Sequence, residues 1–325
     1  MSKKVLAELA LASLLLWPAT AFAQAPWPDK PVRMIVWGGA GSATDAVARV
    51  CPDALAKKFG QPFVFGNKAG ANGLMGTEAA VKSPNDGYTL LFTYAGAQVV
   101  NPSLIDKIPV DVCKDFAGIA QIGGGGNLLV VPSSTRVKDM KEFMAFVKSK
   151  PADELSCGCW GNGSGGHLGM EAIKQQAGIK IKPIPYKTSA AANQDLFVGH
   201  VQASLPAVAL ALPLVQSGKM KALACSGTVP VRRLPQVESM TAQDVTSGNN
   251  ACCAMFARAG TPVAIVNSLN AEINRLIQAP EMAERWNTLG FSDMPIKTSE
   301  QFADQVRRDV RDYAAIAKAG NIKPD

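Results

Sequence analysis

The chain has 325 residues, of which 47% are hydrophobic and 18% are charged, and its formal net charge at pH 7 is +7. These values are ordinary for a folded globular protein and exclude a low-complexity or disordered chain. The positive charge is mild and spread without a basic block, so it favours the approach of anionic ligands and gives little support to nucleic-acid binding.

The amino terminus has the three parts of a secretory signal peptide. Lys3 and Lys4 supply the positive charge, and the apolar stretch over residues 5–17 is shorter than the roughly 20 residues of a membrane-spanning helix. Ala21-Phe22-Ala23 is a small-x-small site, which predicts cleavage after Ala23 rather than an uncleaved anchor. We therefore expect residues 1–23 to be removed, leaving a soluble periplasmic protein of 302 residues with a net charge of +6.

Short apolar strands alternate with helical patterns after the signal peptide, which predicts an α/β fold with mostly parallel strands. In the first unit we expect strands at residues 32–37, 63–65 and 89–93 and helices at residues 44–59 and 74–82. Pro52 should kink the first helix, because proline lacks the N–H group that a helix interior needs. Four consecutive glycines at positions 123–126, between expected strands 117–122 and 128–131, indicate a flexible crossing to a second unit.

The second unit repeats the alternation and then returns to the first. Its expected strands are residues 155–159, 181–185 and 222–225, and its expected helices are residues 140–149, 167–177, 190–198 and 207–217. A polar segment at residues 226–250 leads back, and helices follow at residues 262–278, 280–289 and 298–319. The double crossing predicts two lobes, one of residues 24–123 with 251–325 and one of residues 124–250, with a ligand cleft between them.

Three loops of small residues each follow an expected strand and open a helix. They are residues 38–45, residues 94–97 and residues 161–167. Glycine lets backbone N–H groups approach a ligand closely, and the amino terminus of a helix favours an anion. Loops from both lobes facing one cleft are what a clamp for carboxylates requires, although small residues are common at such turns in any α/β protein.

Gly161, Gly163 and Gly166 formally satisfy the G-x-G-x-x-G pattern of a dinucleotide site. Such a site also needs an acidic residue about 20 positions further on, where this chain has Pro185-Tyr186-Lys187. We reject this interpretation and expect no cofactor.

Ser164 and His167 are the residue types of a serine hydrolase. Ser164 lacks the G-x-S-x-G elbow, however, because Asn162 stands where the first glycine belongs. His167 with Cys157 and Cys159 also resembles a metal site, but C-x-C plus one histidine lacks a fourth ligand. We expect no catalytic residue and no metal, and we keep a secreted serine hydrolase as the alternative hypothesis.

All seven cysteines lie in the mature chain, and an oxidising compartment should pair some of them and leave at least one as a thiol. Cys225 could pair with Cys252 or Cys253 in the return region, and Cys51 could pair with Cys113. The spacing alone leaves these pairings open.

An ordered set of short motifs runs from residue 27 through the return to the first unit. In the first unit the motifs are Trp27-Pro28-Asp29-Lys30-Pro31-Val32-Arg33, Thr44-Asp45 with Ala48-Arg49, Asn67 with Gly70-Ala71-Asn72-Gly73, residues 84–90 (PNDGYTL), Asn101-Pro102-Ser103-Leu104 and Lys114-Asp115-Phe116. Further along they are Gly161-Asn162-Gly163-Ser164 with His167-Leu168, Pro185-Tyr186-Lys187, Asp195-Leu196 with Gly199, and Ala259-Gly260-Thr261-Pro262. In this order the motifs resemble those of the Bug-type solute-binding proteins, the TctC-like receptors of tripartite tricarboxylate transporters.

The resemblance implies a type II periplasmic-binding-protein fold, which closes on a small organic carboxylate. We expect a monomer that delivers this ligand to the membrane subunits of such a transporter. By the same resemblance, Asp45 faces the far end of the ligand or a water, and the loop from Asn162 to His167 holds a carboxylate through backbone N–H groups and Ser164 Oγ. The implied ligand-binding residues are Ala40, Gly41, Ser42, Thr44, Asp45, Tyr94, Ala95, Asn101, Asn162, Gly163, Ser164, Gly166, His167, Tyr186, Lys187, Thr188 and Pro206.

This chain departs from the family pattern at several positions around the expected cleft. It has Trp37-Gly38 in place of proline-phenylalanine, Gly41-Ser42 in place of two glycines, Thr188 in place of glycine, and Pro206 where an aspartate is frequent. The loss of that carboxylate and the gain of hydroxyl groups favour a dicarboxylate or an aromatic carboxylate over a ligand that carries an amide or an amine.

Overall fold

The computed structural model describes residues 27–70, 73–104, 108–124, 126–186, 188–227, 229–245, 252–291 and 294–322. The predicted signal peptide and Lys187 lie outside these described residues. Within them, no helix combines the length and the apolar character that crossing a membrane requires.

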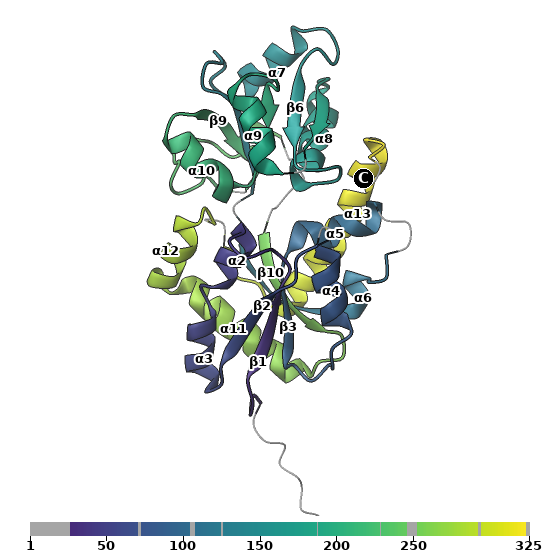
Figure 1. The fold of residues 1–325 in the computed structure, drawn as a ribbon, viewed down its shortest axis with the longest axis vertical. Coiled ribbons are helices and arrows are strands. Elements are labelled where there is room, and N and C mark those ends of the chain that lie inside the picture. The colour runs from purple at the N-terminus through teal and green to yellow at the C-terminus, as the bar shows by residue number, and fades with distance from the viewer. Residues whose placement is uncertain are drawn as a thin grey trace, which may run out of the picture.

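The described residues form two lobes, each built on a five-stranded sheet (Figure 1). The first sheet has the order β2-β1-β3-β10-β4, with β1 (Val32–Val36), β2 (Phe63–Asn67), β3 (Thr89–Tyr94), β4 (Phe116–Gly124) and β10 (Cys252–Arg258). The second has the order β7-β6-β8-β5-β9, with β5 (Leu128–Pro132), β6 (Ser156–Cys159), β7 (Lys182–Pro185), β8 (Ala203–Ser204) and β9 (Met220–Cys225). We call these lobe 1 and lobe 2, and they confirm the predicted two-lobed α/β fold.

One strand in each sheet runs antiparallel to its neighbours. β10 is antiparallel to β3 and β4, and β5 is antiparallel to β8 and β9, whereas β1 is parallel to β2 and β3, and β6 is parallel to β7 and β8. β5 and β10 are the first strands after the two crossings between the lobes. The chain enters each of them at the cleft and must run away from it, so these two strands are the exceptions in sheets that are otherwise mostly parallel, as predicted.

Helices cover both faces of each sheet. Those of lobe 1 are α2 (Ala43–Ala48), α3 (Pro52–Phe59), α4 (Leu74–Val81), α5 (Ala95–Leu104), α6 (Val112–Asp115), α11 (Val263–Gln278), α12 (Pro280–Thr288) and α13 (Ser299–Ala319). Those of lobe 2 are α7 (Met140–Lys148), α8 (Gly165–Ala177), α9 (Ser189–Phe197) and α10 (Val208–Gln216), with a 3-10 turn at Thr241–Gln243.

Proline explains the two largest differences from the predicted helices. The helix expected at residues 44–59 is two helices, because Pro52 begins α3 in the first turn, where its missing N–H leaves no gap in the hydrogen bonding. The sequence predicts α5 only as a helix without bounds after residues 94–97, because Gly96 and the interior Pro102 both lower the helix propensity of its sequence.

Successive residues of a strand are buried in apolar clusters on opposite faces of the sheet. In β1, Met34 and Val36 are buried on one face with Leu269 of α11, and Ile35 is buried on the other face with Phe302 of α13. This alternation follows from the two-residue repeat of a strand, and β5 of lobe 2 shows the same pattern. Both sheets are therefore firmly packed platforms whose strand ends position the loops at the cleft.

α13 joins the two lobes at one side of the cleft. It runs along lobe 1, and its carboxyl-terminal end lies beside α8 of lobe 2 (Figure 1). Leu168 of α8 is buried in the same apolar cluster as Val99 of α5 and Tyr313 and Ala317 of α13. This contact fixes the start of α8 with respect to lobe 1.

The structure corrects both proposed cysteine pairings, because all seven cysteines are thiols. Cys51 and Cys113 pack against clusters on opposite faces of the first sheet, and Cys225 ends a strand of lobe 2 whereas Cys252 begins a strand of lobe 1. Burial raises the pKa of the Cys51 thiol to about 12, so this group stays protonated and unreactive at neutral pH.

Candidate functional site

A small cavity of about 40 Å³ lies where the two lobes face each other. Lobe 1 lines it with Trp37, which follows β1, and with Tyr94, Gly96 and Val100 of the segment from the end of β3 into α5. Lobe 2 lines it with Trp160, Gly163, Ser164 and Gly165, which connect β6 to α8. The cavity thus sits beyond the carboxyl ends of parallel strands, which is where open α/β sheets bind ligands.

The lobe 2 wall is the amino terminus of α8. Ser164 is the N-cap, and its Oγ accepts a hydrogen bond of 3.3 Å from the backbone N–H of His167. Because Oγ only accepts in this bond, the Ser164 hydroxyl can still donate its own proton to a ligand. An acceptor placed here meets both that hydroxyl and the partial positive charge of a 13-residue helix. This wall can therefore hold one carboxylate.

His167 is turned into α8 and does not form a catalytic pair with Ser164. Its Nδ1 accepts a hydrogen bond of 3.2 Å from the backbone N–H of Gly163, and its Nε2 faces Glu171 Oε1 at 3.9 Å. With Nδ1 as the acceptor, the neutral ring carries its proton on Nε2, and no ring nitrogen is left to take a proton from Ser164. A serine nucleophile needs such a base, so this geometry does not support the hydrolase alternative.

Asp45 braces the lobe 1 loop through its side-chain hydrogen bonds. The side chain is 2% exposed. Its Oδ2 accepts from the Gly41 N–H at 2.9 Å and from Arg49 Nε at 2.9 Å, and its Oδ1 accepts from Asn67 Nδ2 at 2.9 Å. Burial on its own raises the pKa of this carboxyl, but these hydrogen bonds outweigh it and hold the pKa below the usual value. The expected contact of Asp45 with the far end of the ligand stays a prediction, and what the structure shows is its bracing of the loop.

Trp37 and Tyr94 form an aromatic wall on the lobe 1 side, and Trp37 is absent from the predicted site. Their rings stack with centroids 6.3 Å apart and planes 24° apart. Trp37 Nε1 donates to Thr44 Oγ1 at 3.2 Å, so Thr44 helps to orient this wall. The Tyr94 hydroxyl is buried with no hydrogen-bond partner among the described residues, and burial raises its pKa.

The structure brings only part of the predicted set to the cavity. Tyr94, Gly163 and Ser164 line it, and Gly166 packs directly beneath Trp160. In lobe 1, Ala40 and Gly41 lie exposed in the turn before α2, Ser42 caps α2 by accepting from the Asp45 N–H, Ala95 begins α5 and Asn101 is buried on α5. In lobe 2, Asn162 lies in the turn before Gly163, and Thr188 caps α9 by accepting from the Ala191 N–H. Pro206 is buried, and its carbonyl accepts from the Leu128 N–H. Lys187 lies outside the described residues.

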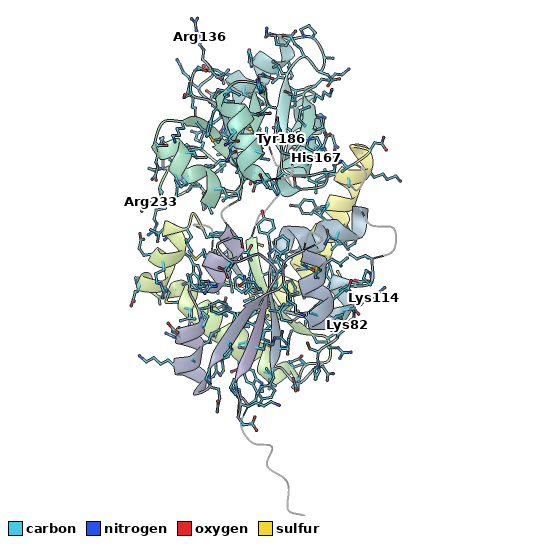
Figure 2. The ribbon with its side chains drawn as sticks, viewed as in Figure 1. Lys82, Lys114, Arg136, His167, Tyr186 and Arg233 are labelled. Carbon is cyan, nitrogen blue, oxygen red and sulfur yellow. The ribbon has the colours of Figure 1, made fainter. Side chains whose placement is uncertain are left out.

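Tyr186 braces α9 instead of lining the cavity. Its hydroxyl donates to Asp195 Oδ2 at 2.6 Å, and burial together with this carboxylate raises its pKa to about 12. Figure 2 shows Tyr186 and His167 in lobe 2.

We expect Tyr186→Phe to lower the free energy of unfolding by about 1 kcal/mol, the usual net contribution of one hydrogen bond. The affinity for ligand should stay unchanged, because the hydroxyl that is removed binds Asp195. Chemical denaturation and titration calorimetry measure the two quantities, with Tyr94→Phe as the matched substitution inside the cavity. A loss of affinity larger for Tyr186→Phe than for Tyr94→Phe would show that Tyr186 contacts the ligand.

Two tryptophans that line the cavity are absent from the predicted ligand-binding residues, and a common signal marks both. Trp37-Gly38 follows β1 directly, and Trp160-Gly161 follows β6 directly. The turn itself does not need a bulky aromatic residue at the position before its glycines, so an aromatic residue there indicates another role. The occurrence of a tryptophan at this position in both lobes is the signal that points to the two cavity walls.

Comparisons with known proteins agree on one family. The model of the family described as "Tripartite tricarboxylate transporter family receptor" matches residues 47–321. The Bordetella pertussis protein BugT is 32% identical over 320 residues, which are 96% of this chain and 98% of BugT. The solved structure of periplasmic binding protein BugD has a TM-score of 0.73 at 26% identity, covering 92% of this chain and 100% of BugD. An R. palustris protein solved with adipate has a TM-score of 0.77 at 26% identity, with the same two coverages.

Proposed function

The chain belongs to the tripartite tricarboxylate transporter receptor family, and on this premise we propose that it is a periplasmic receptor for a small organic carboxylate. The carboxylate binds in the cavity between the lobes, and the loaded receptor delivers it to the membrane subunits of a transporter. The observation that carries this proposal is the start of α8, capped by Ser164, which forms one wall of that cavity. The adipate found with the R. palustris relative is a ligand of the same chemical class.

The proposed contacts follow from the geometry of the two walls. The ligand carboxylate lies against the N–H groups at the start of α8 and the Ser164 hydroxyl, and the body of the ligand extends toward Trp37 and Tyr94 of lobe 1. Asp45 and Thr44 act indirectly: Asp45 holds the lobe 1 loop in place, and Thr44 holds Trp37 in place. The contact of Lys187 with ligand stays a prediction.

Three further points belong to the same proposal. The signal peptide is cleaved after Ala23, the receptor is a monomer, and the lobes consist of residues 24–123 with 251–325 and of residues 124–250. The placement of β4 and β10 in one sheet and of β5 and β9 in the other supports this division. Mass spectrometry of the mature protein and light scattering test the cleavage site and the monomer.

Ser164→Ala separates a receptor from a hydrolase. A hydrogen bond to a charged group contributes about 1.5–3 kcal/mol, so we expect the affinity for a bound carboxylate to fall roughly 10- to 100-fold. Titration calorimetry measures this, and Thr298→Ala, which removes the N-cap of α13 instead, controls for the loss of a helix cap. If Ser164→Ala abolished a measurable turnover of an ester panel by wild-type protein, the protein would be a hydrolase.

A further inference from the structure

Aromatic rings close the inter-lobe cavity from opposite sides. Trp37 and Tyr94 stand on the lobe 1 side as a stacked pair, and Trp160 stands on the lobe 2 side. Facing aromatic walls of this kind favour a flat apolar group, because ring stacking adds to the burial of apolar area.

Both tryptophan rings are held in place by backbone that approaches them closely. A Cβ atom on Gly166 would lie 2.5 Å from Cζ3 of Trp160 and 3.0 Å from the Leu205 carbonyl oxygen. A Cβ atom on Gly73 would overlap the six-membered ring of Trp37. The two rings therefore rest directly on glycine backbone in lobe 2 and lobe 1. Walls fixed in this way are preorganised, so binding a flat ligand costs little side-chain entropy.

Charge is missing from the described lining of the cavity. No lysine or arginine is among its described lining residues, and of the two hydroxyl-bearing side chains there, Ser164 and Tyr94, the Tyr94 hydroxyl is buried. Arg49, the residue that ends α2, is bound to Asp45. One carboxylate has donors at α8, but a second carboxylate buried toward lobe 1 would meet aromatic rings without a cation, which is strongly unfavourable.

We infer that this receptor selects a monocarboxylate with a flat aromatic body over an aliphatic dicarboxylate. The carboxylate lies at the start of α8, and the ring of the ligand lies between Trp160 and the Trp37–Tyr94 pair. This inference rests on the proposed carboxylate-receptor function and narrows it to one chemical class. It distinguishes this chain from the R. palustris relative solved with the dicarboxylate adipate.

Three acids test the inference on the wild-type protein by titration calorimetry. Hexanoate and adipate have the same chain length and differ in the second carboxylate, and benzoate replaces the chain by a ring. We expect benzoate to bind most tightly and hexanoate to bind at least about tenfold more tightly than adipate, because only adipate must bury a second charge.

Trp160→Leu tests the ring contact. The affinity for benzoate should fall about three- to tenfold, as expected for the loss of an aromatic pair, and the affinity for hexanoate should change less. Trp160→Phe keeps a ring and should retain most of the preference, and thermal unfolding of each variant shows that the fold is intact.

The outcomes separate this inference from the function on which it rests. Adipate binding as tightly as hexanoate, or equal losses of benzoate and hexanoate affinity in Trp160→Leu, would overturn the aromatic selection and leave a carboxylate receptor. Binding of none of the three acids would overturn the selection, and the proposed function would fall with it only if no other small carboxylate bound.

Discussion

Replacing Gly166 by leucine should abolish ligand binding in a protein that still folds. Any side chain at this position meets the Trp160 ring and the Leu205 carbonyl oxygen, so Trp160 must leave its place in the cavity wall or move into the cavity. Gly166 lies in the first turn of α8, where leucine suits the helix, and overpacking costs about 1–3 kcal/mol of stability. We expect the affinity for benzoate to fall at least about 100-fold, the equivalent of some 2.7 kcal/mol.

Titration calorimetry and circular dichroism on the same preparation separate binding from folding. Gly66→Leu is the matched control, because Gly66 lies in β2 with open space around the position of its Cβ. Unchanged affinity in Gly166→Leu would mean that the position of Trp160 has no role in binding.

Asp45→Ala should be the most destabilising single change in the lobe 1 loop. The substitution removes the carboxylate acceptor of the half-buried Asn67 amide, of the Gly41 N–H and of Arg49, although the Asn67 amide keeps its bond to the Gly38 carbonyl. A hydrogen bond to a charged group contributes about 1.5–3 kcal/mol, and the exposed Gly41 and half-exposed Arg49 add little, so we expect a loss of about 1.5–3 kcal/mol. Chemical denaturation measures the loss, with Asp53→Ala on the exposed side of α3 as control.

The pH dependence of this effect has a definite sign. The pKa of Asp45 is lower in the folded protein than in the unfolded chain, where it is about 3.9. The stabilisation by its carboxylate is therefore fully present above about pH 4 and disappears as the pH falls through the folded pKa. The difference between wild type and Asp45→Ala should be constant from neutral pH down to about pH 5 and shrink in stronger acid. A difference no larger than that of Asp53→Ala at pH 7 would contradict the bracing role.

The sequence predicts the lobes well because their signals are local. Apolar runs such as residues 32–36 and the turn glycines that follow them specify a strand and its end without reference to the rest of the chain. The direction of β5 and β10 has no local signal, because it results from the side at which the chain enters each lobe. The cysteine pairings fail for the same reason, since only the fold places Cys51 and Cys113 on opposite faces of one sheet.

In the site, too, the residues with a local sequence signal could be predicted and the others could not. Ser164 could be predicted because an N-cap serine in a glycine-rich turn is recognisable from its neighbours. The bracing role of Asp45 could not, since its partner Asn67 lies 22 positions away. Trp37 and Trp160 come together only when the two lobes face each other. The aromatic character of the cavity is therefore a property of the assembled cleft.

Thermal unfolding of the wild-type protein with a panel of carboxylates and their matching amides tests the receptor function most directly. A ligand present at 100 times its Kd adds about 2.7 kcal/mol to the free energy of unfolding, which is readily seen as a rise in Tm. We predict that at least one small carboxylate, with benzoate foremost, raises the Tm and that its neutral amide does not. No shift with any carboxylate, or tight binding of an amide without binding of any acid, would contradict a carboxylate receptor.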